Sequence, residues 1–357
     1  MHMAREGDAT LKKIAAKSGV SVPTVSRVLS GKGEQYRISQ STIDHVNRIA
    51  SELNYTPNYL ASSLRLKRTL TLGLIIPDIS NPFFSSLARS IEKATRHGGY
   101  SIILCDSEET TKIEIESFKL LESRKVDGLI VSPVGQESRH FLAGNEPRVP
   151  MVLVDRYFPE LRIPYVTSDS YHGAIDAVTH LIDHGHRRIA CIQGLHDTSS
   201  NIDRVRGYVD AHKNRGLEVD ESLIVGDNFG EENGYIEAKI LMKRAQRPTA
   251  VFCVGNLISL GVLKALAEDG LAIPQDLSLI SFDDHPYFSF LSPPITTVAH
   301  QNIELGRIAS RLLLDRIESP STHESGGIFV PTKLLVRDSV RRLHPDWRSD
   351  ETLIQRA

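Results

Sequence analysis

Hydroxylated, small and basic side chains alternate with apolar ones between Thr10 and Leu29. Two short helices are predicted here. Thr10 can cap the first with its hydroxyl, and Gly19 can take the left-handed conformation that ends it. The apolar residues that share the inner face of this helix are Leu11, Ile14 and Ala15.

The second helix presents an outer face of small and hydroxylated side chains. Ser21 can cap it, and Pro23 falls in its first turn, where no N–H partner is lost. The residues predicted to face inward are Val25, Val28 and Leu29. The outer face consists of Val22, Thr24, Ser26 and Arg27. Such a helix can enter the major groove of DNA, whose width just admits it; an ordinary helical hairpin is the alternative.

The elements that follow predict a small helical domain and a larger α/β region. A third helix is predicted from a Ser39 cap to Leu53, after a polar loop over 30–38, and residues 58–68 form a short helix or a linker. From Thr69 strands and helices alternate, which predicts a doubly wound α/β fold in two lobes. The predicted strands are 70–77, 100–105, 128–132, 151–154, 165–168, 188–192, 250–254 and 277–282. The predicted helices are 83–97, 112–123, 173–184, 202–215, 233–243, 257–269 and 301–317.

The composition differs between a basic N-terminal segment, residues 1–68, here called the head, and the acidic remainder of the chain. Residues 1–68 hold 11 Lys and Arg against 5 Asp and Glu, which leaves 31 against 39 in the rest of the 357 residues. This asymmetry predicts a polyanionic partner for the head alone. No apolar run approaches the ~20 residues of a membrane span, and the N-terminus lacks a signal-peptide core, so a cytoplasmic protein is expected. The single cysteines Cys105, Cys191 and Cys253 are interpreted as buried core thiols.

The motifs of common enzyme classes are absent from the sequence. No Gly-x-Gly-x-x-Gly follows a strand, and there is no phosphate-binding loop, Gly-x-Ser-x-Gly or His-Glu-x-x-His. His184 and His186 have no third ligand at useful spacing, so no metal is expected. The prediction is a non-enzyme without a cofactor. A solute-binding protein of the same core is the alternative, but it would have a signal peptide and no basic head.

A set of motifs in fixed order is similar to those of one known family. They are Gly19-Val-Ser-Val-Pro-Thr-Val-Ser-Arg-Val-Leu29, Leu53-Asn-Tyr-Thr-Pro-Asn58, Gly73-Leu-Ile-Ile-Pro-Asp-Ile-Ser-Asn-Pro-Phe-Phe84, Val126-Asp-Gly-Leu-Ile130, Val154-Asp-Arg156, Gly185-His-Arg-Arg-Ile-Ala190, Arg204-Val-Arg-Gly-Tyr208, Ser281-Phe-Asp-Asp284 and Pro293-Pro-Ile-Thr-Thr-Val298. On these motifs the chain resembles transcriptional regulators of the lactose/galactose-repressor (LacI/GalR) family over residues 9–343. One motif would be weak, whereas the ordered set is specific.

The resemblance implies a domain plan and a set of partners. The plan is a disordered arm (1–8), a helix-turn-helix headpiece (9–57), a hinge helix (58–68), a core resembling periplasmic binding proteins (69–343) and a polar tail (344–357). One lobe of the core would span about 69–167 and 302–330, and the other about 168–301 and 331–343. The implied partners are near-palindromic double-stranded operator DNA, a second copy of the chain and a small-molecule effector, most simply a sugar. The tail has no leucine heptad, which favours a homodimer.

The resemblance also assigns the DNA contacts. Arg27 is the best candidate for reading guanine, although a phosphate contact or an intradomain ion pair is the alternative. Leu64 matches the wedge that enters the minor groove, or else packs against the partner hinge. The loop from Gly31 to Arg37 is longer than the family pattern, so its register on DNA is open. The full predicted DNA-contacting set is Thr10, Ser21, Val22, Pro23, Thr24, Ser26, Arg27, Arg37, Asn58, Ala61, Leu64 and Arg65.

The resemblance predicts which charged residues bind the effector in the cleft, and the position of two of them at strand ends supports this prediction. Asp155 and Asp283 each follow a predicted strand, where open α/β sheets bind ligands, and Arg204 opens a helical motif. Carboxylates and a guanidinium suit a polyhydroxylated ligand. A surface ion pair of Asp155 with Arg156, a turn at Asp283 and core packing of the aromatics are the alternatives. The further candidates are Phe83, Phe84, Tyr157, Asp169, Phe229 and Asn256. Effector binding would shift the population of lobe arrangements and so alter DNA affinity.

Overall fold

The computed structural model describes residues 10–55, 68–135, 137–144, 146–319 and 326–343. The chain divides into two compact units, Met1–Thr69 and Leu70–Ala357, and each is described by itself. The predicted arm, the polar tail and nearly all of the hinge lie outside the described residues. The predicted DNA contacts that fall there are Asn58, Ala61, Leu64 and Arg65.

The first unit is a bundle of short helices around a small apolar core. Its elements are α1 (Leu11–Ser18), α2 (Val22–Leu29), the 3-10 helix η1 (Glu34–Tyr36) and α3 (Gln40–Glu52). Ile14, Val25 and Val46 are fully buried at its centre. Gly19 ends α1 with φ of 68°, the left-handed conformation expected from the sequence. The predicted loop after Leu29 contains η1, a turn of helix that its polar composition did not indicate.

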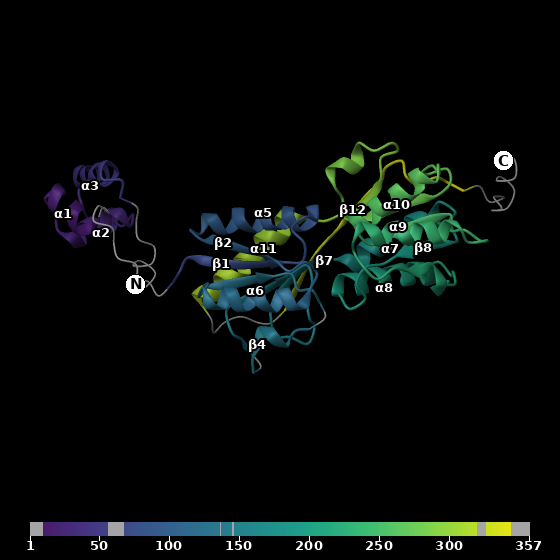
Figure 1. Cartoon of the computed structure of the whole chain (residues 1–357), viewed down its shortest axis with the longest axis horizontal. Helices are drawn as coiled ribbons and strands as arrows, with labels where there is room; N and C mark the ends of the chain where they lie inside the picture. The colour runs from purple at the N-terminus through teal and green to yellow at the C-terminus, as the bar shows by residue number, and fades with distance from the viewer. Residues whose placement is uncertain (1–9, 56–67, 136, 145, 320–325, 344–357) are drawn as a thin grey trace. The chain divides into compact units, whose positions relative to one another are not determined.

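The second unit has two lobes, each built on a six-stranded sheet (Figure 1). The strands of the first sheet are β1 (Thr71–Ile76), β2 (Ser101–Asp106), β3 (Gly128–Val131), β6 (Met151–Val154), β7 (Tyr165–Ser168) and β13 (Gly327–Val330). They pair in the order β13-β7-β6-β3-β1-β2, and every pair is parallel. Because both faces are covered, the strands are continuous apolar runs, as in β3 and β6, whose residues are all buried. A small hairpin, β4 (Leu142–Ala143) with β5 (Glu146–Pro147), stands apart from this sheet and follows the 3-10 helix η2 (Arg139–Phe141).

Helices cover the two faces of this first sheet. Helices α5 (Pro82–His97) and α11 (Asn302–Glu318) pack together on one face, where Leu87 and Leu305 are fully buried. Helix α6 (Thr111–Ser123) covers the opposite face with Phe118 and Leu121 (Figure 1). Lobe one is therefore completed by a helix and a strand, α11 and β13, from late in the chain.

The second sheet repeats the same winding. Its strands are β8 (Ile189–Ile192), β9 (Ile224–Val225), β10 (Ala250–Cys253), β11 (Ser278–Phe282), β12 (Thr296–Ala299) and β14 (Lys333–Leu335). They pair in the order β14-β12-β11-β10-β8-β9, and only β14 runs antiparallel to its neighbour. Its helices, in pairs on the two faces, are α7 (Ser170–Asp183) with α8 (Ser199–Asn214) and α9 (Glu231–Met242) with α10 (Asn256–Glu268). Two 3-10 turns, η3 (Glu221–Leu223) and η4 (Pro286–Ser289), complete this lobe.

The chain crosses between the two sheets three times. It leaves the first sheet after β7, returns after β12 and leaves again after β13. The three crossovers are hydrogen-bonded to one another. Ser168 Oγ lies 2.6 Å from His300 Nδ1, Gln301 Nε2 donates to the Pro331 carbonyl, and Thr332 Oγ1 donates to the Asp169 carbonyl. A change in the angle between the lobes must therefore act on this bonded group of strand ends.

Several local expectations are settled by the structure. Cys191 and Cys253 are buried free thiols, whereas Cys105 is only partly buried, on the edge strand β2. His186 is buried and bonded to Thr249 Oγ1 and the Arg341 carbonyl, and burial lowers its pKa to about 4. None of the helices in the described residues combines the length and hydropathy needed to span a membrane.

Candidate functional site

Helix α2 presents the outer face that the sequence predicts. Ser21 is its N-cap and accepts a hydrogen bond from the Thr24 amide at 3.3 Å, and the two hydroxyls lie 2.8 Å apart. Thr10 caps α1 in the same way through the Lys13 amide. Val22 and Pro23 are exposed at the start of α2, while Val25 and Val28 are buried beneath it. Ser21 and Thr10 thus have a structural role as caps whatever else they contact.

Arg27 lies on this face with its guanidinium over an aromatic ring. Its central carbon is 4.1 Å from the centroid of Tyr36, which belongs to η1 in the longer loop. Arg37 follows in a left-handed conformation with φ of 53° and is exposed. The loop whose register was open from the sequence therefore places the Tyr36 ring beside the end of α2, and the exposed Arg37 is the next residue in the chain.

The second candidate site is the cleft between the two lobes of the core. It encloses a cavity of about 20 Å³. Six predicted residues line it: Phe83, Phe84, Asp155, Arg204, Phe229 and Asp283. Such a volume holds about one water molecule, so a sugar-sized ligand requires the lobes or the lining side chains to move.

Two buried carboxylates dominate the cleft, and both come from strand ends. Asp155 follows β6 with φ of 66°, and Asp283 follows β11 with φ of 67°. Aspartate is among the few side chains that adopt this left-handed conformation, which carries a strain of about 1–3 kcal/mol that the surrounding structure must hold. Strained backbone is typical of ligand-binding sites, and here it occurs at the matching strand end of each lobe.

The environments of the two carboxylates push their pKa values in opposite directions. Burial raises the pKa of Asp155, and the positive charge of Arg204 offsets this only in part. Burial acts on Asp283 too, but the Arg204 charge and the His300 hydrogen bond hold its pKa below its ordinary value. Asp155 Oδ1 is buried and has no hydrogen-bond donor among the described residues. Asp155 is thus an acceptor without a protein partner, whereas Asp283 is already paired.

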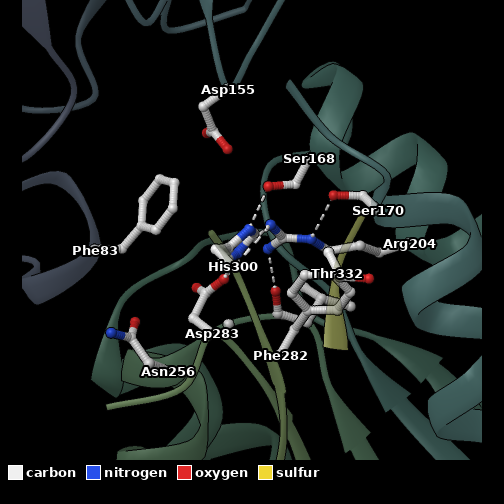
Figure 2. A network of polar contacts seen from close by, with 12 residues as sticks. Phe83, Asp155, Ser168, Ser170, Arg204, Asn256, Phe282, Asp283, His300 and Thr332 are labelled. Carbon is white, nitrogen blue, oxygen red and sulfur yellow. Dashed lines mark hydrogen bonds and ion pairs between the residues drawn. The ribbon is translucent and has the colours of Figure 1, made fainter. Parts of the chain in front are cut away.

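Arg204 is held rigidly beside Asp283. Its Nη1 donates to the Val254 carbonyl at 2.6 Å, and Nη2 is 3.5 Å from Asp283 Oδ1. The guanidinium carbon also lies over the Phe282 ring, 3.9 Å from its centroid. Figure 2 shows the two side chains side by side. Only 3% of the residue is exposed, so Arg204 has a structural role as the cation that fixes the buried Asp283 carboxylate.

His300 belongs to the polar network of the cleft, although it was not among the residues predicted from the sequence. Its Nε2 lies 2.5 Å from Asp283 Oδ1; because a carboxylate only accepts, Nε2 carries the proton. In the neutral ring Nδ1 then accepts from the Ser168 hydroxyl (Figure 2). The ring packs against Phe83 of the first lobe at 4.6 Å and Phe282 of the second at 5.3 Å. A histidine directly after a strand could have signalled this position.

Arg156 is buried and does not form the surface ion pair considered from sequence. Both of its terminal nitrogens bond the Glu109 carboxylate at 2.6 Å. Its guanidinium lies between rings from the two lobes, 5.6 Å from Phe84 and 5.0 Å from Phe229. Phe84 and Phe229, two of the aromatic cleft candidates, thus each contact a cation of the protein itself.

The remaining candidates lie outside the cavity. Asn256 is buried and bridges the lobes, since its Nδ2 donates to Asn81 Oδ1 at 3.2 Å. Asp169 caps α7 and faces His172, so its carboxylate serves the helix and is not part of the cavity lining. Tyr157 stacks on Tyr165 with ring centroids 4.1 Å apart.

Comparison with known proteins gives the same assignment for both units. Residues 10–58 match the family described as bacterial regulatory proteins, lacI family, and residues 178–340 match the periplasmic binding protein-like domain. The transcriptional repressor CytR of Escherichia coli K12 is 34% identical over 341 residues, 95% of this chain and 98% of that protein. The ribose operon repressor of Haemophilus influenzae is 34% identical over 337 residues, 94% of this chain and 99% of that protein.

A solved structure extends the likeness to the fold. The complex of the transcriptional regulator CelR with cellobiose superimposes with a TM-score of 0.70 at 31% identity, over 93% of this chain and 99% of that one. The capped helix pair, the two lobes of identical winding and the full-length relatives agree. The chain belongs to the lacI family of bacterial regulatory proteins, and it is a DNA-binding transcriptional regulator.

Proposed function

We propose that this regulator represses transcription from a near-palindromic operator as a homodimer, and that a neutral polyhydroxylated effector, a sugar or a nucleoside, controls it from the cleft. The observation that carries the proposal is the pair of buried carboxylates in left-handed conformation. They face one cavity from opposite lobes. A ligand that bonds both would favour one lobe arrangement over the other, which is the requirement for a population shift.

The charges around the cavity select the ligand class. Three carboxylates, Asp155, Asp283 and Glu109, face the two guanidinium groups of Arg156 and Arg204. Of these, Arg156 is paired with Glu109 and Arg204 with Asp283, which leaves the Asp155 carboxylate in excess. An excess acceptor suits a hydroxyl donor and repels a phosphate. The ribose and cellobiose named for two relatives are neutral polyols, which supports this class.

A thermal-shift screen of the full-length protein tests the ligand class. Neutral sugars and nucleosides are compared with their phosphates, because binding to the folded state raises the melting temperature by mass action. We expect a hit among the neutral compounds that is lost in Asp155→Asn, with no hit for its phosphate. A phosphorylated compound that binds more tightly than its neutral parent would refute the charge argument.

On the DNA side we propose that α2 enters the major groove. Arg27 would read a base edge, Val22 and Pro23 would make apolar contacts, and Ser21 and Thr24 would meet phosphates. Thr10, Ser26 and Arg37 are further proposed contacts of the described headpiece. In the segment outside the described residues, Asn58, Ala61, Leu64 and Arg65 are proposed for the hinge.

Selection from a random duplex pool with the full-length protein tests this assignment. Wild-type protein should enrich a near-palindrome whose affinity falls steeply with added salt. Arg27→Ala should lose preference at one base pair of each half-site, by about 1–3 kcal/mol. An equal loss on all sequences would leave Arg27 as a phosphate contact. The proposal includes no enzymatic activity, cofactor or metal, and places the protein in the cytoplasm with the DNA.

A further inference from the structure

The longer loop between α2 and α3 carries an aromatic residue that none of the assignments above uses. We propose that Tyr36 is a specificity-determining residue of the headpiece, because it holds the Arg27 guanidinium in the orientation that reads a base edge. The inference rests on the proposed role of Arg27 in base readout. The guanidinium carbon lies over the ring, 4.1 Å from its centroid.

The contact with the ring leaves the N–H groups of the Arg27 side chain without a hydrogen-bond acceptor in the described headpiece. Within the described part of the headpiece, residues 10–55, no hydrogen bond or ion pair involves the Arg27 side chain. A carboxylate partner would have consumed the N–H groups that a guanine requires. Stacking on an aromatic face uses the π surface of the planar cation, so its in-plane donors stay available.

The position of the ring is fixed by the backbone of the loop. The Tyr36 amide donates to the carbonyls of Lys32 and Gly33, each at 3.2 Å. The Lys32 amide in turn donates to the Arg27 carbonyl at 2.9 Å, which ties the loop to the end of α2. On its other side Gly33 lies against α3, where a Cβ atom would come within 2.7 Å of the Ile43 side chain. Lys32 and Gly33 thus hold the start of the loop against α2 and α3, and the Tyr36 amide is bonded to the same two residues.

This arrangement lowers the entropic cost of forming a bidentate hydrogen bond between Arg27 and a base. A free arginine side chain samples many rotamers, and a bidentate bond to guanine requires one of them. A ring that already restricts the guanidinium plane reduces the ordering that must occur on binding. Half of the Tyr36 side-chain surface remains exposed, so replacing it does not open the apolar core of the headpiece.

The test uses full-length wild-type protein and four variants, Arg27→Ala, Tyr36→Ala, Tyr36→Phe and Gln35→Ala. Each is taken through selection from a random duplex pool, and its affinity is measured for the wild-type operator and for each base change within it. Tyr36→Ala should lose about 2–5-fold of discrimination at the base pair that Arg27→Ala affects, and nowhere else. Tyr36→Phe keeps the ring and should retain wild-type discrimination. Gln35→Ala, an exposed neighbour, is the matched control.

The outcomes separate the inference from the proposal beneath it. If Arg27→Ala weakens all sequences equally, the base-reading role of Arg27 is wrong. A second outcome is that Arg27→Ala weakens binding at one base pair only, while Tyr36→Ala weakens binding to all sequences equally. In that case Tyr36 contacts the DNA backbone, and the inference is overturned. An unchanged Tyr36→Ala profile overturns it too. A loss in Tyr36→Phe that is uniform across sequences would assign the effect to the hydroxyl instead of the ring.

Discussion

Arginine lies over an aromatic ring in both functional regions, but the two arginines differ in what their N–H groups do. Arg27 lies 4.1 Å from the Tyr36 ring on an exposed helix face, and its donors have no partner in the described headpiece. Arg204 lies 3.9 Å from the Phe282 ring in the cleft, and its donors are directed at Val254, Ser170 and Asp283. Both guanidinium groups thus lie over an aromatic ring, but among the described residues only the Arg204 donors have protein acceptors.

The difference shows that the surroundings of an arginine side chain decide which of two tasks it can perform. An exposed guanidinium with open edges is prepared for a partner that arrives from outside, such as a base pair. A buried guanidinium with occupied edges neutralises an internal carboxylate and fixes its position. Under the proposed function, Arg204 would act on the effector chiefly through Asp283, whereas Arg27 would contact DNA directly.

The largest expected effect comes from removing the buried arginine. Arg204→Ala leaves the Asp283 charge in the cleft without its cation, so the free energy of unfolding should fall by about 3–5 kcal/mol. Arg27→Ala should change it by less than about 0.5 kcal/mol, because the side chain is exposed. Urea unfolding of the full chain, followed by circular dichroism, measures both. Equal losses would remove the distinction between the two arginines.

The two cleft carboxylates should respond in opposite ways. Asp283→Asn should destabilise the protein by about 2–3 kcal/mol at pH 7, because charge-assisted hydrogen bonds are lost. Asp155→Asn should be within about 1 kcal/mol of wild type or more stable, since it removes a buried charge that lacks a donor.

Acid titration gives a second way to distinguish the two cleft carboxylates. The pKa of Asp283 is lowered in the folded state, so its stabilisation is present above the ordinary value of 3.8 and lost as pH falls through the lowered pKa. The pKa of Asp155 is raised, so its penalty exists at high pH and disappears as pH falls through the raised pKa. Urea midpoints of wild type and both variants across pH give these two trends. A common trend would contradict the assignment.

A smaller effect is expected at the bond between the first two crossovers. Ser168→Ala leaves His300 Nδ1 without its donor, which should cost about 1–2 kcal/mol of stability. If this bond transmits ligand occupancy, the variant should also show a weaker change of DNA affinity on adding the compound found in the thermal-shift screen. Ser170→Ala is the matched control, because its contact with Arg204 is long, at 3.4 Å. A full response in Ser168→Ala would exclude the bond from the coupling.

The smallest effect belongs to the headpiece caps. Ser21→Ala removes the hydroxyl that accepts from the Thr24 amide, which should cost the first unit about 1 kcal/mol. Hydrogen exchange of the α2 amides in the full chain measures it, with the exposed Lys12→Ala as control. Unchanged protection of α2 in Ser21→Ala would show that Ser21 serves DNA alone.

Local signals explain what the sequence predicted. Caps and stops at Thr10, Gly19 and Ser21 depend on neighbours a few residues away, and the structure has all three. The long buried strands were predicted because parallel strands covered on both faces are continuous apolar runs. Asp155 and Asp283 were predicted as cleft residues because ligands bind at the strand ends of open parallel sheets, and both line the cavity.

What the sequence could not give are contacts between distant segments. His300 bonds Ser168 across 132 positions, and Arg156 pairs with Glu109 across 47, so neither pair leaves a local pattern. Asp169 was placed in the cleft from its position after a strand, but the same aspartate is also the cap of the next helix, and that local bond prevails. The short strands β13 and β14 are partly exposed and carry no periodic pattern.

The three crossovers also have a consequence for how the chain is made. The first lobe is not complete until α11 and β13 have been synthesised, after almost all of the second lobe. At about 5–20 residues per second, the ribosome needs roughly ten to thirty seconds to produce the intervening chain. During that time the sheet face that Leu305 and Leu313 will cover stays bare. The nascent protein is therefore exposed to aggregation during synthesis in a way that the stability of the finished fold does not reveal.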